Sequence, residues 1–211
     1  MAGGNILGNM QAAEIELKFP VTDAEAFRQS AREAGFVVVT PRTFESNTLY
    51  DTEDRQLRKR TELLRLRLYG GRWTMTHKRL PDDYDPAARY KTRVETETTV
   101  EDGEALAEVF SRLGYAPVFR YEKYREEWEE PGSAGHLVLD ETPIGVWAEL
   151  EGAPEWIDRM LEKLQVDPAS SSTASYGALF LAWKQRTGST AENLTFEEAC
   201  EPRVEPGLLA Q

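Results

Sequence analysis

Charged and apolar side chains alternate strictly in residues 14–19, which read Glu-Ile-Glu-Leu-Lys-Phe. A period of two residues is typical of a β-strand, because successive side chains of a strand point to opposite faces. Glu14, Glu16 and Lys18 therefore share one face. On an ordinary surface strand that face would meet water, and a single strand of this kind indicates no chemistry.

The same alternation recurs along the chain with charges of both signs. The cations are Lys18, Arg65, Arg67, Lys78, Arg93, Lys123 and Arg125. The acids are Glu14, Glu16, Glu95, Glu97, Asp140, Glu149 and Glu151. Arginine and lysine suit phosphate oxygens, and carboxylates suit a hard cation such as Mg²⁺ or Mn²⁺ bound together with a phosphorylated substrate. Together these residue types favour a metal-bound polyphosphate as the ligand.

Short strands joined by tight turns must position these residues. We predict about eight strands, mostly in sequential hairpins such as the one around Gly70-Gly71, which favours an antiparallel barrel or sandwich. Four helices are predicted between or after them. The first opens at the capping box 22–25, where Thr22 is the expected cap, and the second opens at Asp102. Residues 52–60 and 80–90 are predicted loops.

The direction in which the charged faces point decides the interpretation. Pointing outward, they would coat a barrel filled with apolar side chains. Pointing inward, they would line a polar tunnel whose apolar outer faces are covered by the helices. The apolar stripes of the helices need sheet surface to cover, which favours the second arrangement. Desolvated like charges repel one another, so a tunnel of this kind requires bound counterions.

Composition narrows the function classes. The 211 residues allow one domain, and 40% apolar residues suffice for a core. A net charge of −12 argues against nucleic acid and anionic membrane surfaces as partners. The single cysteine, Cys200, can form no internal disulfide, and no apolar run reaches the length of a membrane span. The N-terminus does not resemble a signal peptide, so we expect a cytoplasmic protein.

The residues named above resemble the CYTH superfamily, the triphosphate tunnel metalloenzymes. Glu14-x-Glu16-x-Lys18 is similar to the ExExK signature, and Leu64-Arg65-Leu66-Arg67 to the LRxR strand. In the family's order there follow the strand ending in Lys78, Arg93-x-Glu95-x-Glu97, Lys123-x-Arg125, and Asp140 with Glu149-x-Glu151. The resemblance implies an α+β fold: an eight-stranded antiparallel β-barrel tunnel with helices packed on the outside. It covers residues 12–187, between a flexible N-terminus (1–11) and an acidic C-terminal tail (188–211).

Roles follow from the resemblance. It implies that Glu14, Glu16, Asp140, Glu149 and Glu151 hold Mg²⁺ or Mn²⁺. The cations Lys18, Arg65, Arg67, Lys78, Arg93, Lys123 and Arg125 would bind the triphosphate, with Glu95 and Glu97 orienting neighbouring cations. Glu14, Glu16, Lys18 and Glu149 would take part in catalysis, where the metal neutralises phosphate charge and a second metal or an acid activates the nucleophile. His77, on the face opposite Lys78, is not an expected ligand.

Four functions remain open at this point. A triphosphatase would hydrolyse tripolyphosphate, thiamine triphosphate or a nucleoside triphosphate, and we favour it because hydrolysis requires the fewest binding features in the site. A class IV adenylate cyclase would make cyclic AMP and pyrophosphate from ATP, which also requires a pocket for adenine. A polyphosphate-binding module would not need so many carboxylates, and an apolar-cored carrier barrel would need no charged interior. A homodimer is a possible assembly.

Overall fold

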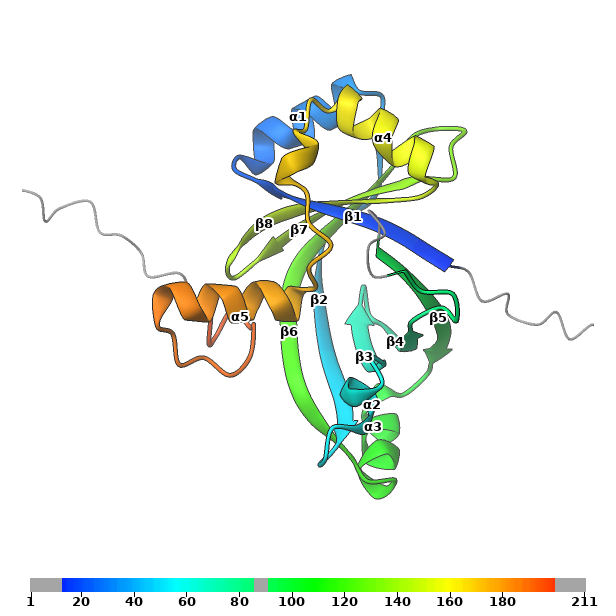
Figure 1. Ribbon diagram of the computed structural model, residues 1–211, viewed down its shortest axis with the longest axis vertical. Helices are drawn as coiled ribbons and strands as arrows, with labels where there is room; N and C mark the ends of the chain where they lie inside the picture. The colour runs from blue at the N-terminus through cyan, green and yellow to red at the C-terminus, as the bar shows by residue number, and fades with distance from the viewer. Residues whose placement is uncertain (1–12, 86–90, 200–211) are drawn as a thin grey trace, which may run out of the picture.

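Eight β-strands dominate the computed structural model, which describes the backbone of residues 13–85 and 91–199 and the side chains of residues 15–85 and 92–199 (Figure 1). The strands are β1 (Ala13–Val21), β2 (Val37–Thr52), β3 (Leu63–Tyr69), β4 (Arg72–Arg79), β5 (Lys91–Val100), β6 (Tyr115–Glu129), β7 (His136–Thr142) and β8 (Gly145–Glu151). The helices of this part of the chain are α1 (Ala24–Glu33), α2 (Gln56–Lys59), α3 (Gly103–Arg112), α4 (Pro154–Lys163) and α5 (Tyr176–Thr187), with a 3₁₀ turn at Pro168–Ser170.

The strands close into one antiparallel barrel in the order β1-β5-β4-β3-β2-β6-β7-β8, so the predicted barrel is confirmed. The two longest strands, β2 and β6, pair with each other from end to end and lie side by side in Figure 1. Sequence reasoning predicted two separate strands where β2 is continuous. Irregularities in the β2–β6 register around Thr40 explain this, since they interrupt the alternation without ending the pairing.

Apolar faces of the strands point outward and are covered by helices, as predicted. Helices α1 and α4 lie together over β1, β7 and β8 (Figure 1), where Leu17, Leu139 and Leu150 meet Ile157 and Leu161. Helix α5 covers a second apolar cluster. Helix α3 packs on a third, at the end of the barrel opposite α1 and α4 (Figure 1). Burial of these outer faces leaves the inner faces of the strands to the charged side chains.

Capping side chains fix where α1 and α3 begin. Asp102 caps α3 as predicted, its carboxylate accepting from the Ala105 amide at 2.9 Å. The cap of α1 is Asp23 rather than Thr22, and its side chain accepts from the amides of Glu25 and Ala26. A carboxylate is at least as good an N-cap as a hydroxyl, which explains the shift by one residue.

Two segments differ from the predicted loop and tail. Within the predicted loop 52–60, the short helix α2 forms because Asp51 accepts from the amides of Leu57 and Arg58, at 2.9 and 3.0 Å. The structure thus has five α-helices in its described residues, where the sequence predicted four. In the predicted tail, residues 189–199 pack on the barrel: Leu194 is fully buried and exchanges backbone hydrogen bonds with Arg120 and Glu122.

Other predictions fall partly or wholly on undescribed residues. The predicted N-terminal segment (1–11), the end of the predicted loop at 86–90 and the tail beyond 199 lie outside the described residues, as does Cys200. Among the helices that the structure does describe, none combines the length and hydropathy that crossing a bilayer requires.

Candidate active site

A cavity of about 720 Å³ lies inside the barrel, and most of the side chains that line it are charged or polar. Ten of the predicted site residues line it: Glu16, Arg65, Arg67, Lys78, Glu95, Glu97, Lys123, Arg125, Glu149 and Glu151. The strand register accounts for this grouping. Antiparallel partners share a face, and the register sets Glu16 opposite Glu151, Lys78 opposite Glu95, and Lys123 opposite Glu45.

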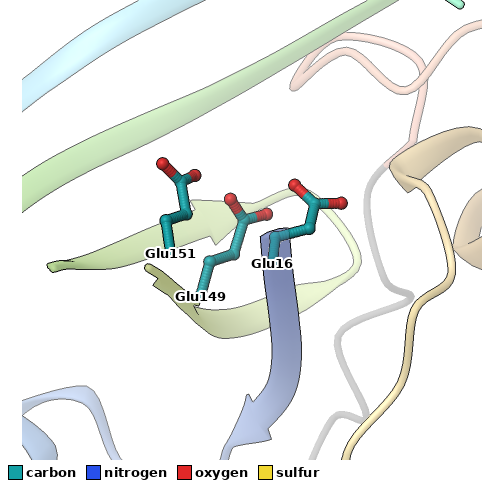
Figure 2. Close-up of side chains that lie close together, drawn as sticks. All are labelled: Glu16, Glu149 and Glu151. Carbon is teal, nitrogen blue, oxygen red and sulfur yellow. The ribbon is translucent and has the colours of Figure 1, made fainter. Parts of the chain in front are cut away.

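Three carboxylates meet at one place in the tunnel. Glu16 on β1 and Glu149 and Glu151 on β8 point their carboxylates into the same space (Figure 2), and one oxygen from each lies within 4.8 Å of the others. Oxygen donors of this kind are the ligands that Mg²⁺ and Mn²⁺ prefer. The donor set therefore fits a hard divalent cation, and it contains three of the five predicted metal ligands.

Two cations hold Glu149. Lys18 donates from Nζ to Glu149 Oε1, and Arg125 Nη2 donates to Oε2 at 3.0 Å. Burial alone would raise the pKa of Glu149, but the attraction of Lys18, Arg125 and Lys123 holds it well below its usual value. For Lys18 burial acts in the opposite direction and alone would lower the pKa, but the attraction of Glu149 outweighs burial, so the pKa of Lys18 is raised. Both groups are therefore charged near neutral pH. Lys18 lies behind Glu149 and is not itself in the cavity lining.

Asp140 holds the neighbouring cations and is fully buried. It accepts from Lys123 Nζ at 2.8 Å, from Arg125 Nε and Nη2 at 2.8 and 2.7 Å, and from the Tyr176 hydroxyl at 2.6 Å. Asp140 lies outside the cluster of three carboxylates and does not line the cavity. The sequence predicts it as a metal ligand, but its contacts are those of an anchor for Lys123 and Arg125.

The strands β3 to β5 carry the second group of cations. Arg65 donates to Thr76 Oγ1 at 3.1 Å and to the Tyr121 hydroxyl at 3.4 Å, and Arg67 donates to Glu97 at 3.5 Å. Within the described part of the chain, the buried Nε atoms of Arg65 and Arg67 have no hydrogen-bond partner. Lys78 pairs with Glu95 on the adjacent strand. Arginine side chains that line a cavity and still have donors without a partner suit an anionic ligand.

Besides Lys18 and Asp140, one further predicted residue with a described side chain is not brought into the cavity. Arg93 does not line it, and its Nη1 donates to the Thr61 carbonyl at 3.4 Å. The Glu14 backbone pairs with Arg93, but its side chain lies outside those described. His77 faces away from Lys78, as predicted, and its Nε2 lies 3.4 Å from Glu62 Oε2.

Among the lining or supporting residues that sequence reasoning missed are Glu45, Tyr121, Glu127, His136 and Tyr176. Alternation could have found the first four. Tyr121 lies two residues before Lys123, Glu127 lies two residues after Arg125, and His136 lies four residues before Asp140. Glu45 lies opposite Lys123 with its side chain fully buried, and its pKa is lowered to about 2 because Lys123 and Arg125 outweigh the effect of burial. Tyr176 begins a helix, and strand alternation gives no signal for it.

Comparisons with known proteins agree with this architecture. The family model for the CYTH domain matches residues 12–165. A protein of Methanocaldococcus jannaschii named "Putative adenylate cyclase MJ0240" is 27% identical over 154 residues, which cover 72% of this chain and 85% of that protein.

Solved structures share the fold. The PH1819 protein of Pyrococcus horikoshii has a TM-score of 0.67 and 25% identity, over 81% of this chain and 99% of its own. A protein of Hippeastrum, HpAC1, has a TM-score of 0.58 and 18% identity, over 81% and 95% of the two chains, and is described as a putative adenylyl cyclase with a dominant triphosphatase activity. With a family model matched over more than half of its length and a closed eight-stranded barrel, the chain belongs to the CYTH domain family.

Proposed function

We propose that this protein is a metal-dependent triphosphatase that binds the triphosphate group of its substrate inside the barrel. The observation that carries the proposal is that one cavity combines the three-carboxylate cluster with Arg65 and Arg67, whose Nε donors lack partners among the described residues. Carboxylates for a hard cation and guanidinium groups for phosphate oxygens are the two requirements of metal-assisted phosphoryl transfer.

The cations and the carboxylates of the lining would have different roles. Arg65, Arg67 and Lys78 would bind phosphate oxygens from one side of the cavity, and Lys123 and Arg125 from the other. Glu16, Glu149 and Glu151 would hold Mg²⁺ or Mn²⁺, which when bound supplies neutralisation of phosphate charge and lowers the pKa of a coordinated water. Attack of water on the terminal phosphorus breaks its bond to the bridging oxygen and releases orthophosphate, so that tripolyphosphate would give pyrophosphate and orthophosphate.

Adenylate cyclisation is the second candidate, because the Methanocaldococcus relative carries that name. It requires a site that holds adenine and orients the ribose. Within the described residues, the cavity lining contains the two tyrosines Tyr121 and Tyr176 beside the imidazole of His136, and the two tyrosine rings stack on each other with centroids 6.0 Å apart. Tyr121 also stacks on Phe119, and Lys18 Nζ lies 4.3 Å from the Tyr176 ring centroid. The two tyrosine rings are already engaged, which favours a ligand without a nucleobase in the tunnel.

The Hippeastrum protein supports hydrolysis as a reaction of this fold, because its dominant activity is that of a triphosphatase although it is named as a cyclase. At 18% identity that likeness concerns the fold and leaves the reaction of this chain to be measured. The triphosphate substrate, the cytoplasmic location and a homodimer all stay predictions.

A product assay tests the proposal. The protein is incubated with tripolyphosphate, thiamine triphosphate or ATP in the presence of Mg²⁺ or Mn²⁺, and orthophosphate, pyrophosphate and cyclic AMP are quantified. We expect orthophosphate release, and a loss of about a hundredfold or more in Glu16→Gln, because a metal ligand matters at least as much as the groups that orient it. Calorimetric titration with Mn²⁺ should show weaker binding in the same variant.

Glu33→Gln, which changes an exposed carboxylate on α1, is the matched control and should retain both activity and Mn²⁺ binding. Cyclic AMP and pyrophosphate from ATP would establish the cyclase instead. Tight metal-dependent binding of tripolyphosphate without any product would leave a binding module.

A further inference from the structure

The segment before helix α5 is joined to the site although it lies beyond residues 12–165, which the family model matches. Ser172 forms an isolated bridge with Lys18 on β1: its amide donates to the Lys18 carbonyl at 2.7 Å, and its carbonyl accepts from the Lys18 amide at 3.1 Å. These two bonds fix the backbone of the residue whose ammonium group holds Glu149. The bridge also brings the start of α5 to the tunnel wall.

Tyr176, the first residue of α5, enters that wall and is 8% exposed. Its hydroxyl donates to Asp140 Oδ2 at 2.6 Å. The Nζ atoms of Lys18 and Lys123 lie 4.3 and 4.9 Å from its ring centroid, within the range of cation–π attraction. One side chain thus contacts the carboxylate that anchors two cations and the ammonium group of a third.

The position of Tyr176 is itself fixed. The Ser175 side chain caps α5 by accepting from the Ala178 amide at 3.2 Å. Further along the helix, Phe180 and Trp183 are buried in a cluster with Ile144 and Leu194. A side chain on a rigidly packed element can hold its neighbours to a narrow geometry, which is what precise binding of a multiply charged ligand requires.

We propose that Tyr176 is a positioning residue for triphosphate binding: it holds Asp140, and through it Lys123 and Arg125, and it holds Lys18 against Glu149. This inference rests on the proposed function. A purely structural tyrosine at this position would stabilise the fold without affecting the affinity for the substrate. The two roles therefore differ in a measurable way.

The experiment measures KM and kcat for tripolyphosphate with Mg²⁺, together with the melting temperature, in Tyr176→Phe and Tyr176→Leu. Phenylalanine keeps the ring and loses the hydroxyl, so Asp140 loses one donor and the cations it anchors become less restrained. We expect KM to rise about tenfold, as for a lost hydrogen bond to a charged group, with kcat within about twofold of the wild type. Leucine also removes the ring beneath Lys18 and Lys123, and KM should rise further.

Tyr50→Phe is the matched control, because Tyr50 is a buried tyrosine that packs against Phe110 on the outside of the barrel, with ring centroids 5.0 Å apart. Its KM should equal that of the wild type. An unchanged KM in both Tyr176 variants, or a lower melting temperature and kcat with KM unchanged, would overturn the inference and leave the proposed function standing. A wild-type protein that neither hydrolyses nor binds tripolyphosphate would overturn both.

Discussion

The charged side chains on the two sides of the tunnel differ in how deeply they are buried and how closely they are paired. The paired wall consists of Lys18, Glu45, Lys123, Arg125, Asp140 and Glu149, on β1, β2 and β6 to β8. The open wall consists of Arg65, Arg67, Lys78, Glu95 and Glu97, on β3 to β5. Asp140 and Lys123 have side-chain exposures of 0 and 3%, whereas Arg67 and Glu97 have 18 and 43%.

The contacts of Asp140 on the paired wall and of Glu97 on the open wall differ in the same way. Asp140 bonds to Lys123 and Arg125 at 2.7 to 2.8 Å, whereas the ion pairs of Glu97 with Arg65 and Arg67 measure 3.8 and 3.5 Å. Buried charges are tolerated only when partners satisfy them, so the paired wall is internally neutralised. Long ion pairs to a partly exposed carboxylate such as Glu97 contribute little to stability, and the arginines can exchange that partner for a ligand. We infer that the paired wall holds its cations in a fixed geometry, whereas Arg65 and Arg67 on the open wall can exchange their ion pairs with Glu97 for contacts with the substrate.

The largest expected effect concerns the anchor of the paired wall. Asp140→Asn should destabilise the protein by about 3–5 kcal/mol, because it leaves the buried charges of the paired wall with one negative charge too few. Urea unfolding at neutral pH measures this change. Glu97→Gln on the open wall is the matched control and should cost less than about 1 kcal/mol. Equal losses in the two variants would contradict the distinction between the walls.

The next effect concerns substrate affinity on the open wall. Arg67→Ala should raise KM for tripolyphosphate by about ten- to a hundredfold, the range expected for losing charge-assisted bonds to phosphate. Its free energy of unfolding should change by less than about 1 kcal/mol, because the ion pair of Arg67 with the partly exposed Glu97 is long, at 3.5 Å. Steady-state kinetics and urea unfolding test the two statements. Arg112→Ala, on the exposed face of α3, controls for a lost positive charge and should change neither.

The smallest effect is a pH dependence of the paired wall. The pKa of Glu45 is lowered to about 2 from an ordinary value of 4.5. Its ionised form therefore stabilises the fold fully above about pH 4.5, and that contribution is lost as the pH falls from there toward the folded-state pKa. Between about pH 5 and pH 3.5 the loss should amount to about 1 kcal/mol.

Glu45→Gln isolates this contribution. The difference in unfolding free energy between the wild type and this variant should shrink as the pH falls through that window. A difference that stays constant would show that Glu45 contributes by packing and hydrogen bonding alone.

Much of the barrel was predictable because a strand has a fixed period. Alternation placed Arg65 and Arg67 on the inner face and Leu66 on the outer one, and the structure agrees. The helices were predicted from caps and apolar spacing, with α2 missed because it depends on the Asp51 side chain. The packing of residues 189–199 was missed because Leu194 joins β6 through an isolated bridge and is buried in the cluster beneath α5, and neither contact leaves a periodic pattern in the sequence.

The sequence by itself determined which side chains share a face, because that property depends only on residue parity within each strand. It also determined that cations and carboxylates share that face in the order of the CYTH motifs. Only the tertiary structure decided which charges meet. Glu16 and Glu149 lie far apart in the chain and are brought together by the β1–β8 pairing that closes the barrel. Asp140 becomes an anchor, and Tyr176 reaches it, through contacts that depend on long-range packing, about which local periodicity carries no information.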